Sequence, residues 1–310
     1  MTITVLIPTF NRPDDLHRCL EAISCQLRKA DQVLIIGSRR DPSQNEIEAQ
    51  LQKARLDASV IFIEESGMVK QINAGLDQCS CDIVAITDDD AAPMPDWLQR
   101  IEAKFAETNA AAVGGRDLLL ENGKILEKKV ALVGKVFPFG IRRGNHHLCS
   151  GPARDVDFLK GVNWAFSMKA IDKMRLDTRL KGSGAIVHCD LDFSLQLRKR
   201  GLRCIYDPLI LVNHYPAARV AGDERVSISR EQIFNRAHNE TLAFLKYYSL
   251  LGQLAYCFQV LLLGTALNPG ILQLFRLLPK EGFLSLLRFK YSLEGRFAAI
   301  QSYSEKTFSA

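Results

Sequence analysis

The sequence predicts an α/β fold, with a mostly parallel sheet flanked by helices and a helical C-terminal appendage. Short apolar runs, typical of buried strands, alternate with segments of helical periodicity along the first part of the chain. This alternation indicates a parallel sheet that is covered on both faces. Between Lys246 and Arg276 the chain has no charged residue, which marks a change of character. With 310 residues, the chain is long enough for one large domain and an additional segment.

Four short apolar runs predict the first strands, at residues 3–7, 33–36, 60–63 and 83–86. Apolar residues at helical spacing predict the helices between them, at about residues 16–23, 45–56 and 69–76. Further elements are expected at residues 170–174 and 190–200 (helices) and 204–206 (a strand). Residues 113–160 contain Gly-rich and basic loops that the pattern leaves unassigned. In sheets of this kind, ligands bind at the carboxyl ends of the strands.

The uncharged stretch from Tyr247 to Phe275 is long enough to span a membrane. However, its Gln and Asn side chains are costly in lipid, and Pro269-Gly270 interrupts it. Two helices that lie on the membrane or dip into it therefore fit better than a single span. A helical pair packed on the preceding domain is the alternative. Basic residues become more frequent toward the C-terminal end, which favours an anionic membrane surface.

Charge and cysteine usage narrow the class of protein. The net charge of +5 is mild and the basic residues are scattered, so no nucleic-acid partner is expected. Strand-like residues follow Met1 directly, so no secretory signal is expected. The eight cysteines lack metal-binding spacing, which favours reduced thiols. We therefore expect a cytoplasmic protein, peripheral or monotopic at the cytoplasmic face of a membrane.

Three adjacent acids, Asp88, Asp89 and Asp90, directly follow the fourth predicted strand. Neighbouring carboxylates repel one another, and this repulsion costs stability unless a cation compensates it. Carboxylate oxygens suit Mg²⁺ or Mn²⁺, which also bind the oxygens of a diphosphate. The alternative is a solvated acidic turn.

Several motifs, in their expected order, make residues 3–215 similar to glycosyltransferase family 2. They are Pro8-Thr9-Phe10-Asn11-Arg12, Gly67, Asn73-Ala74-Gly75, the acids with Pro93 and Trp97-Leu98, Gly161-Val162-Asn163, Asp190, Gly201, and Tyr206-Asp207-Pro208 with His214. The resemblance implies the GT-A fold and transfer of a sugar from a nucleoside diphosphate donor. The expected domains are a catalytic domain, residues 1–225, and a helical, membrane-associated tail, residues 226–310. Within the catalytic domain, the nucleotide-binding half is about 1–112 and the acceptor half about 113–225.

The resemblance also implies roles for single residues. Nucleotide-sugar binding is implied for Pro8, Thr9, Asn11, Arg12, Asn73, Asp88 and Asp89. Asp88 and Asp90 occupy the acidic places of the DXD motif and, with His214, imply a site for Mg²⁺ or Mn²⁺. A histidine that ends a strand for packing reasons is the alternative for His214. Acceptor binding is implied for Gly161, Asn163 and Trp164, where a buried, packing tryptophan is the alternative.

Asp190 corresponds to the general base of the family. An acceptor hydroxyl has a very high pKa and attacks the anomeric carbon only if its proton is removed in the transition state. A single displacement of this kind inverts the anomeric centre. As a helix N-terminal acid, Asp190 would also interact favourably with the helix dipole. Asp192 is expected to be a surface acid of the same helix.

We therefore expect an inverting, metal-dependent glycosyltransferase for hexosyl or related groups. Its acceptor is expected to be a saccharide or lipid-linked molecule, in cell-surface polysaccharide or glycolipid synthesis. One alternative is a catalytically decayed membrane scaffold, since Gly37, Cys189 and Gln196 depart from the family's pattern. The other is a nucleotidyltransferase, which also uses acids and Mg²⁺ but usually carries a Gly-rich basic loop where this chain has Pro8-Thr9.

Overall fold

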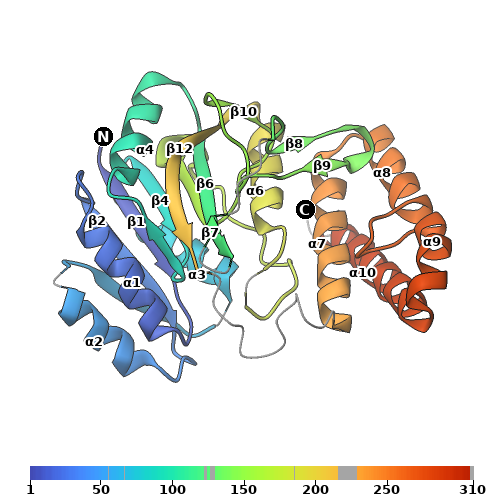
Figure 1. The fold of residues 1–310 in the computed structure, drawn as a ribbon, viewed down its shortest axis with the longest axis horizontal. Helices are drawn as coiled ribbons and strands as arrows, with labels where there is room; N and C mark the ends of the chain where they lie inside the picture. Colours follow the sequence, from blue (N-terminus) through green and yellow to red (C-terminus); the bar gives the residue numbers. More distant parts are fainter. Residues whose placement is uncertain are drawn as a thin grey trace. The chain divides into compact units, whose positions relative to one another are not determined.

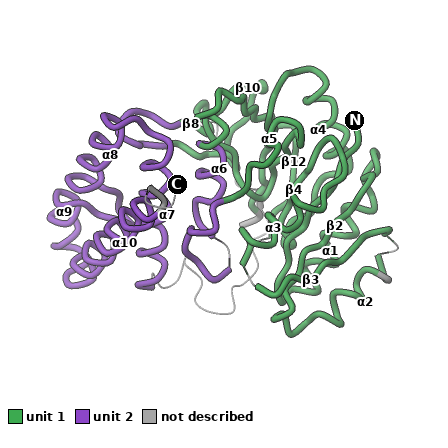
Figure 2. Tube along the Cα trace, turned by 180° about the vertical axis from the view of Figure 1, so that it is seen from behind, with its two compact units in different colours: residues 1–135, 143–176, 196–217 green, residues 136–142, 177–195, 218–310 purple. Residues whose placement is uncertain are grey.

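The computed structural model describes residues 1–54, 56–65, 67–121, 124–125, 130–184, 186–215 and 229–307. Contacts within the chain define two compact units (Figure 2). Unit 1 contains residues 1–135, 143–176 and 196–217, and unit 2 contains residues 136–142, 177–195 and 218–310. Unit 2 therefore combines two internal segments with the C-terminal helices.

A single large sheet forms the centre of unit 1 (Figure 1), in the strand order β10-β12-β6-β11-β4-β1-β2-β3, with β5 beside β12 and β7 beside β6. Its strands are β1 (Ile3–Pro8), β2 (Gln32–Ser38), β3 (Ser59–Ile63), β4 (Ile83–Thr87), β5 (Ala91–Pro93), β6 (Ala112–Glu121), β7 (Lys124–Ile125), β10 (Arg154–Val156), β11 (Asn163–Ser167) and β12 (Cys204–His214). β1 to β4 pair in parallel, as do β6 and β12, whereas β11 runs antiparallel to both of its neighbours. The predicted mostly parallel sheet is confirmed.

The helices of unit 1 follow from the apolar spacing of the sequence. They are α1 (Pro13–Ser24), α2 (Gln44–Ala54), α3 (Met68–Gln78), α4 (Trp97–Glu107) and α5 (Met168–Ile171), and α6 (Cys189–Lys199) passes from unit 2 into unit 1. α3 packs very closely on the sheet, because a Cβ added at Gly75 would lie 2.2 Å from Leu6. Only glycine permits this distance.

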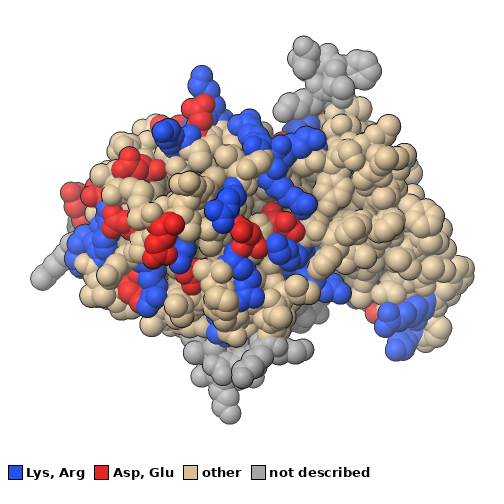
Figure 3. Space-filling model, turned by 90° about the horizontal axis from the view of Figure 1, so that it is seen from above, with Lys and Arg blue, Asp and Glu red and all other residues tan. Residues whose placement is uncertain are grey.

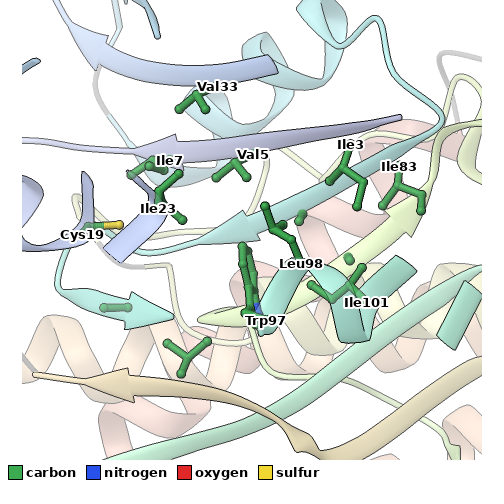
Figure 4. Close-up of a cluster of buried hydrophobic side chains, with 14 of the residues drawn as sticks. Ile3, Val5, Ile7, Cys19, Ile23, Val33, Ile83, Trp97, Leu98 and Ile101 are labelled. Atoms are coloured by element: carbon green, nitrogen blue, oxygen red, sulfur yellow. The ribbon is translucent and has the colours of Figure 1, made fainter. Parts of the chain in front are cut away.

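The main core lies on the other face of β1, where α1 and α4 pack (Figure 4). Ile3, Val5 and Ile7 alternate along β1 and share one buried cluster with side chains of both helices. Trp97 begins α4 within this cluster, and its indole Nε1 donates to Asn163 Oδ1 at 2.9 Å. This hydrogen bond joins α4 to β11, beside the end of β4.

The C-terminal helices of unit 2 are α7 (Arg230–Tyr247), α8 (Leu250–Leu262), α9 (Ile271–Glu281) and α10 (Phe283–Thr307). α7 and α10 approach closely at Gly295, where a Cβ would lie 2.4 Å from the Phe234 carbonyl oxygen. α8 and α9 lie on either side of Pro269-Gly270, as the sequence predicts. Within the described residues, no helix has both the length and the hydropathy needed to cross a bilayer.

Two internal segments pack on these helices within unit 2. The first forms the loop between β8 (Lys135–Val136) and β9 (Arg142–Arg143), with a 3-10 turn, η1 (Pro138–Gly140). The second contains the start of α6. Asn239 of α7 holds this second segment, since its amide donates to the carbonyls of Lys181 and Val187 at 2.9 Å each.

Asp192 of α6 is not the surface acid that the sequence predicts. It is 1% exposed, and Lys246 Nζ of α7 lies 2.7 Å from its Oδ1 and 2.6 Å from Asp177 Oδ2. Burial would raise the pKa of Asp177, but hydrogen bonds from Arg179 and Lys246 lower it. The prediction was wrong because the partner cation lies 54 residues away in sequence.

We expect Lys246→Met to destabilise unit 2 strongly, because it leaves the buried Asp192 and the partly buried Asp177 without this cation. Removing one partner of a buried ion pair costs about 3–5 kcal/mol. Urea unfolding followed by circular dichroism measures the change. Lys290→Met is the matched control, since Lys290 is 66% exposed and lies 3.9 Å from Glu294; its effect should stay below about 1 kcal/mol. Equal effects of the two substitutions would contradict this account.

Candidate functional site

The three acids form a turn between β4 and β5, at the carboxyl end of β4. The Ala91 amide closes this turn by donating to the Asp88 carbonyl at 3.3 Å. β5 then pairs antiparallel with the end of β12, which places His214 opposite Ala91. The Tyr215 amide donates to the Asp90 carbonyl at 2.9 Å. Strand pairing thus brings His214 to the acids across more than a hundred residues of sequence.

Asp88, Asp90 and His214 can direct ligand atoms at one point. One atom from each lies within 4.8 Å of the others, and His214 Nε2 is 3.4 Å from Asp90 Oδ1. Two carboxylate oxygens and one imidazole nitrogen fit a divalent ion such as Mn²⁺ or Mg²⁺. The residues present therefore fit the metal that the sequence motif implies.

Asp117 of β6 is a further acid beside this site; it is buried, and the sequence reasoning missed it. It pairs with Lys160 Nζ, and His214 Nδ1 lies 3.8 Å from its Oδ2. The parallel pairing of β6 with β12 places Asp117 opposite Val212, close to His214. His214 therefore lies between Asp90 and Asp117. In the sequence, the only signal for this role was an acid directly before the apolar run Leu118-Leu119-Leu120.

Charge interactions shift the pKa values of this cluster. Burial, helped by the charge of Asp90, raises the pKa of Asp88 to about 6 and that of Asp89 to about 7. Burial opposes a charged His214, but hydrogen bonds to Asp117 and Asp90 raise its pKa to about 9. Without a metal ion, His214 is therefore protonated at pH 7 and its positive charge offsets the carboxylates. A metal ion would take over this compensation and displace the proton.

Asp89 faces away from this triad, toward the loop after β1. Its Oδ2 accepts from Thr9 Oγ1 at 2.9 Å, and its Oδ1 lies 3.1 Å from Arg12 Nη1. Arg12 Nη1 is also 3.5 Å from Asp90 Oδ2. The structure thus brings the predicted residues Thr9 and Arg12 to the acidic cluster.

Two residues that the sequence reasoning missed hold the loop after β1. Asp41 is buried, and its Oδ2 accepts from the Asn11 amide at 2.7 Å, where Asn11 has a left-handed φ of 54°. Gln71 Nε2 donates to the Thr9 carbonyl at 2.6 Å and to the Ile36 carbonyl at 2.8 Å. Pro8 ends β1 directly before this loop. The turn-forming Asp-Pro-Ser after the second strand was the available signal for Asp41.

Asn73 hydrogen-bonds to Leu176 and not to this loop. Its amide nitrogen donates to the Leu176 carbonyl and its oxygen accepts from the Leu176 amide, both at 2.8 Å.

The glycine at position 37, which departs from the family's pattern, is explained by its close neighbour on β3. A Cβ there would lie 2.7 Å from the Phe62 ring, so β3 fills the space that a side chain would need.

The expected acceptor residues are largely buried. Trp164 is 1% exposed and packs edge-to-face on Phe166, with ring centroids 5.0 Å apart. Its flat face is therefore not available to a sugar. Trp164 is instead a buried, packing tryptophan, which was the alternative. Asn163 is buried and donates to the Ile210 carbonyl at 2.9 Å while it accepts from Trp97. Gly161 lies in the turn before β11 and is partly buried.

Asp190 belongs to unit 2, in the first turn of α6. Its carboxylate is partly exposed, and its Oδ1 accepts from the Leu191 amide at 2.8 Å. Two residues earlier, His188 Nε2 lies 3.1 Å from Arg142 Nη2, and Arg142 pairs with Glu240 of α7. Burial lowers the pKa of Arg142, against the opposing charge of Asp190. Arg142 is thus a basic residue near Asp190, which the sequence reasoning missed.

We expect Asp117→Asn to lower the pKa of His214 by one unit or more, because an anionic partner of the imidazolium is lost. An NMR titration of the histidine ring protons in chelator-treated protein measures this value. Glu107→Gln, at an exposed acid of unit 1, should leave the titration unchanged. A His214 that still titrates near pH 9 in the Asp117 variant would show that Asp117 does not hold the proton.

Comparison with known proteins finds sequence similarity to glycosyltransferases in part of the chain. Residues 4–154 match the model of Glycosyl transferase family 2. Glycosyltransferase AglE of Haloferax volcanii is 28% identical over 116 residues, which cover 36% of this chain and 38% of the relative. The amylovoran biosynthesis glycosyltransferase AmsE of Erwinia amylovora is 25% identical over 154 residues, 47% of this chain and 58% of the relative. These matches span less than two thirds of either relative.

Solved structures with the same fold cover nearly the whole chain. The mannosyltransferase PcManGT from Pyrobaculum calidifontis, in complex with GDP-Man and Mn²⁺, has a TM-score of 0.57 at 15% identity and covers 96% of this chain and 86% of its own. S. aureus TarS 1–349, in complex with UDP-GlcNAc, has a TM-score of 0.61 at 15% identity and covers 98% of this chain and 80% of its own. At this identity the likeness shows the fold, which is GT-A. Over residues 4–154, just under half of its length, the chain matches glycosyl transferase family 2.

Proposed function

We propose that the protein is an inverting, divalent-metal-dependent glycosyltransferase with a nucleoside diphosphate sugar donor. The observation that carries this proposal is the convergence of Asp88, Asp90 and His214 within 4.8 Å, directly after a central strand of a GT-A sheet. Ligands bind at this edge of an α/β sheet. Structural neighbours crystallised with GDP-Man and Mn²⁺ and with UDP-GlcNAc support a donor of this class.

The donor site is proposed to combine two groups of residues. Asp88, Asp90 and His214 would hold Mg²⁺ or Mn²⁺, which when bound stabilises the negative charge of the departing diphosphate. Pro8, Thr9, Asn11 and Arg12 would bind the nucleotide. Asp89 contacts Thr9 and Arg12, which supports a role in orienting that loop toward the donor. Asn73 would act indirectly, through its two hydrogen bonds to Leu176.

Asp190 is proposed as the general base on the acceptor side. A partly exposed acid at a helix N-terminus is accessible to an acceptor hydroxyl, and the helix dipole interacts favourably with its negative charge. Proton removal by this carboxylate during a single displacement gives inversion at the anomeric carbon. Gly161 remains a candidate for the acceptor side, whereas the buried Asn163 and Trp164 are proposed to support it from the core.

The biological setting is proposed to be polysaccharide or glycolipid synthesis at the cytoplasmic face of a membrane, with a saccharide or lipid-linked acceptor. The relative named for amylovoran biosynthesis supports this setting. Exposed apolar side chains on α8 and α9, such as Leu251 and Phe275, support membrane contact. Removal of the tail is a poor test, since it also removes Lys246 from the buried Asp192. Point substitutions avoid this loss.

We expect Asp90→Ala to abolish sugar transfer and nearly abolish Mn²⁺-dependent binding of a nucleoside diphosphate, with the fold intact. The reason is that one of two carboxylate ligands of the ion is lost. Isothermal titration of UDP and GDP, each with and without Mn²⁺, measures binding. Glu107→Ala, which removes an exposed acid of unit 1, should bind like wild type. Nucleotide affinity of the wild-type protein that a chelator leaves unchanged would argue against a metal here.

We expect Asp190→Asn to lower kcat about a hundredfold or more, because it removes the proton acceptor while keeping size. Nucleoside diphosphate affinity should stay within a few-fold, since a base acts in the transition state. Steady-state kinetics and nucleotide titrations separate the two effects. Asp192 is unsuitable as a control because it is buried and ion-paired, so Glu231→Gln, at an exposed acid of α7, replaces it. Weak nucleotide binding with normal kcat would instead place Asp190 at the donor.

A further inference from the structure

A short loop of unit 2 exposes three large apolar side chains. Phe137, Phe139 and Ile141 lie between β8 and β9, and Phe139 is 48% exposed. Its φ of 65° is left-handed, a conformation that aromatic residues rarely adopt because the Cβ approaches the carbonyl oxygen too closely. The loop therefore keeps an aromatic ring in water on a strained backbone. Strain of this kind often marks a binding segment, and here the exposed ring favours an apolar partner.

Close packing fixes this loop on α8. Gly140 has a φ of 73°, and a Cβ added there would lie 2.5 Å from the Tyr256 ring of α8. Tyr256 is buried, and its hydroxyl is 3.1 Å from Thr241 Oγ1 of α7. The loop and α8 therefore lie side by side, as Figures 1 and 2 both show.

The surface of α8 extends the apolar character of the loop. We define the apolar face as the exposed apolar side chains of the loop and of α8, which are Phe137, Phe139, Ile141, Leu250, Leu251, Leu254, Phe258 and Leu261. Figure 3 shows a broad area without charged side chains over the helices of unit 2. A patch of this kind on a soluble domain marks a binding surface.

The charges beside the apolar face are basic. No charged residue occurs from Tyr247 to Phe275. Lys135 and Arg143 flank the loop in the sequence, and exposed Arg276 and Lys280 lie on α9, whose last residue, Glu281, pairs with Arg288. Apolar side chains that are flanked by cations complement the headgroup region of an anionic bilayer. Charge complementarity thus favours a membrane over an acceptor in free solution.

The apolar face continues into the surroundings of Asp190. Arg142 directly follows Ile141 and lies 3.1 Å from His188, two residues before Asp190. We propose that the apolar face inserts into the headgroup–acyl boundary of an anionic membrane and that the acceptor is lipid-linked, reaching Asp190 from the bilayer. The acceptor part rests on the proposed function, since it takes Asp190 as the base. The membrane part rests on the apolar face alone.

Phe139→Asn tests insertion without disturbing the loop. Asn tolerates a left-handed φ, so the variant keeps the backbone and the net charge and loses only the ring. Its partition coefficient onto vesicles of phosphatidylcholine and phosphatidylglycerol should fall about tenfold, the effect of one buried aromatic side chain. Leu209→Asn is the matched control, because Leu209 is 57% exposed on β12 of unit 1; it should bind like wild type. Unchanged vesicle binding of Phe139→Asn would overturn the proposal.

A fluorescent reporter adds a second, independent measurement. Both native tryptophans, Trp97 and Trp164, are buried, so Phe139→Trp places the one exposed indole in the loop. Brominated lipids should quench this indole in vesicle-bound protein. An unquenched indole would overturn insertion. Light scattering covers the other occupant, a second copy of the chain. If the wild type does not bind vesicles but self-associates, and Phe139→Asn abolishes this self-association, insertion is also overturned.

The acceptor class is tested with a long-chain alkyl glycoside in vesicles and the matching methyl glycoside in solution. The wild type should use the embedded glycoside with a kcat/KM at least about tenfold higher, and Phe139→Asn should lose this preference. Equal use of both glycosides by the wild type would overturn the lipid-linked acceptor. UDP and GDP titrations with Mn²⁺ should be the same for Phe139→Asn and wild type. Absence of Mn²⁺-dependent nucleotide binding in the wild type would contradict the proposed function and leave the vesicle results standing.

Discussion

The site depends on one electrostatic constraint, the cost of burying carboxylates together at the end of a sheet. Asp89, Asp90 and Asp117 are all buried, and each ionised carboxylate is costly in such a place without a cation. Arg12, His214 and Lys160 supply these cations from three separate segments. The long β12 carries His214 to this position, and pairing of its end with β5 keeps it there. Much of the local topology can thus be understood as charge compensation.

The sequence predicted the parts of this arrangement that depend on local pattern. Continuous apolar runs identified β1 to β4, and the acids after β4 pointed to a metal site. The strand β6 escaped notice because Gly114 and Gly115 interrupt its apolar pattern. The structure explains Gly115, where a Cβ would lie 2.0 Å from the Ile210 carbonyl oxygen. Asp117, which lies on this strand, was missed for the same reason.

Other residues were not predictable because their partners are distant in sequence. Asp192 has the spacing of a helix-surface acid, and only the ion pair with Lys246, 54 residues later, makes it a buried one. Trp164 is likewise a core residue because β11 lies between β4 and β6. Sequence pattern gives periodicity, whereas burial depends on which elements pair. The same argument applies to Arg142, which contacts Glu240 of α7.

The C-terminal helices have a role in supporting the start of α6. Lys246 pairs with Asp192, and Asn239 holds the residues before the helix. Glu240 pairs with Arg142, which in turn contacts His188. Within unit 2, the proposed base therefore lies on a helix start that α7 fixes by several polar contacts. The loop and α8, which carry the apolar face, thus belong to the same unit as Asp190.

The coordination of a bound metal ion tests the central claim most directly. Pulsed electron paramagnetic resonance of Mn²⁺, added with a nucleoside diphosphate, detects a directly coordinated imidazole nitrogen and the phosphorus of the diphosphate. We expect both couplings in the wild-type protein, and loss of the nitrogen coupling in His214→Ala. A bound Mn²⁺ without nitrogen coupling, or one that keeps it after His214→Ala, would contradict a metal site formed by Asp88, Asp90 and His214.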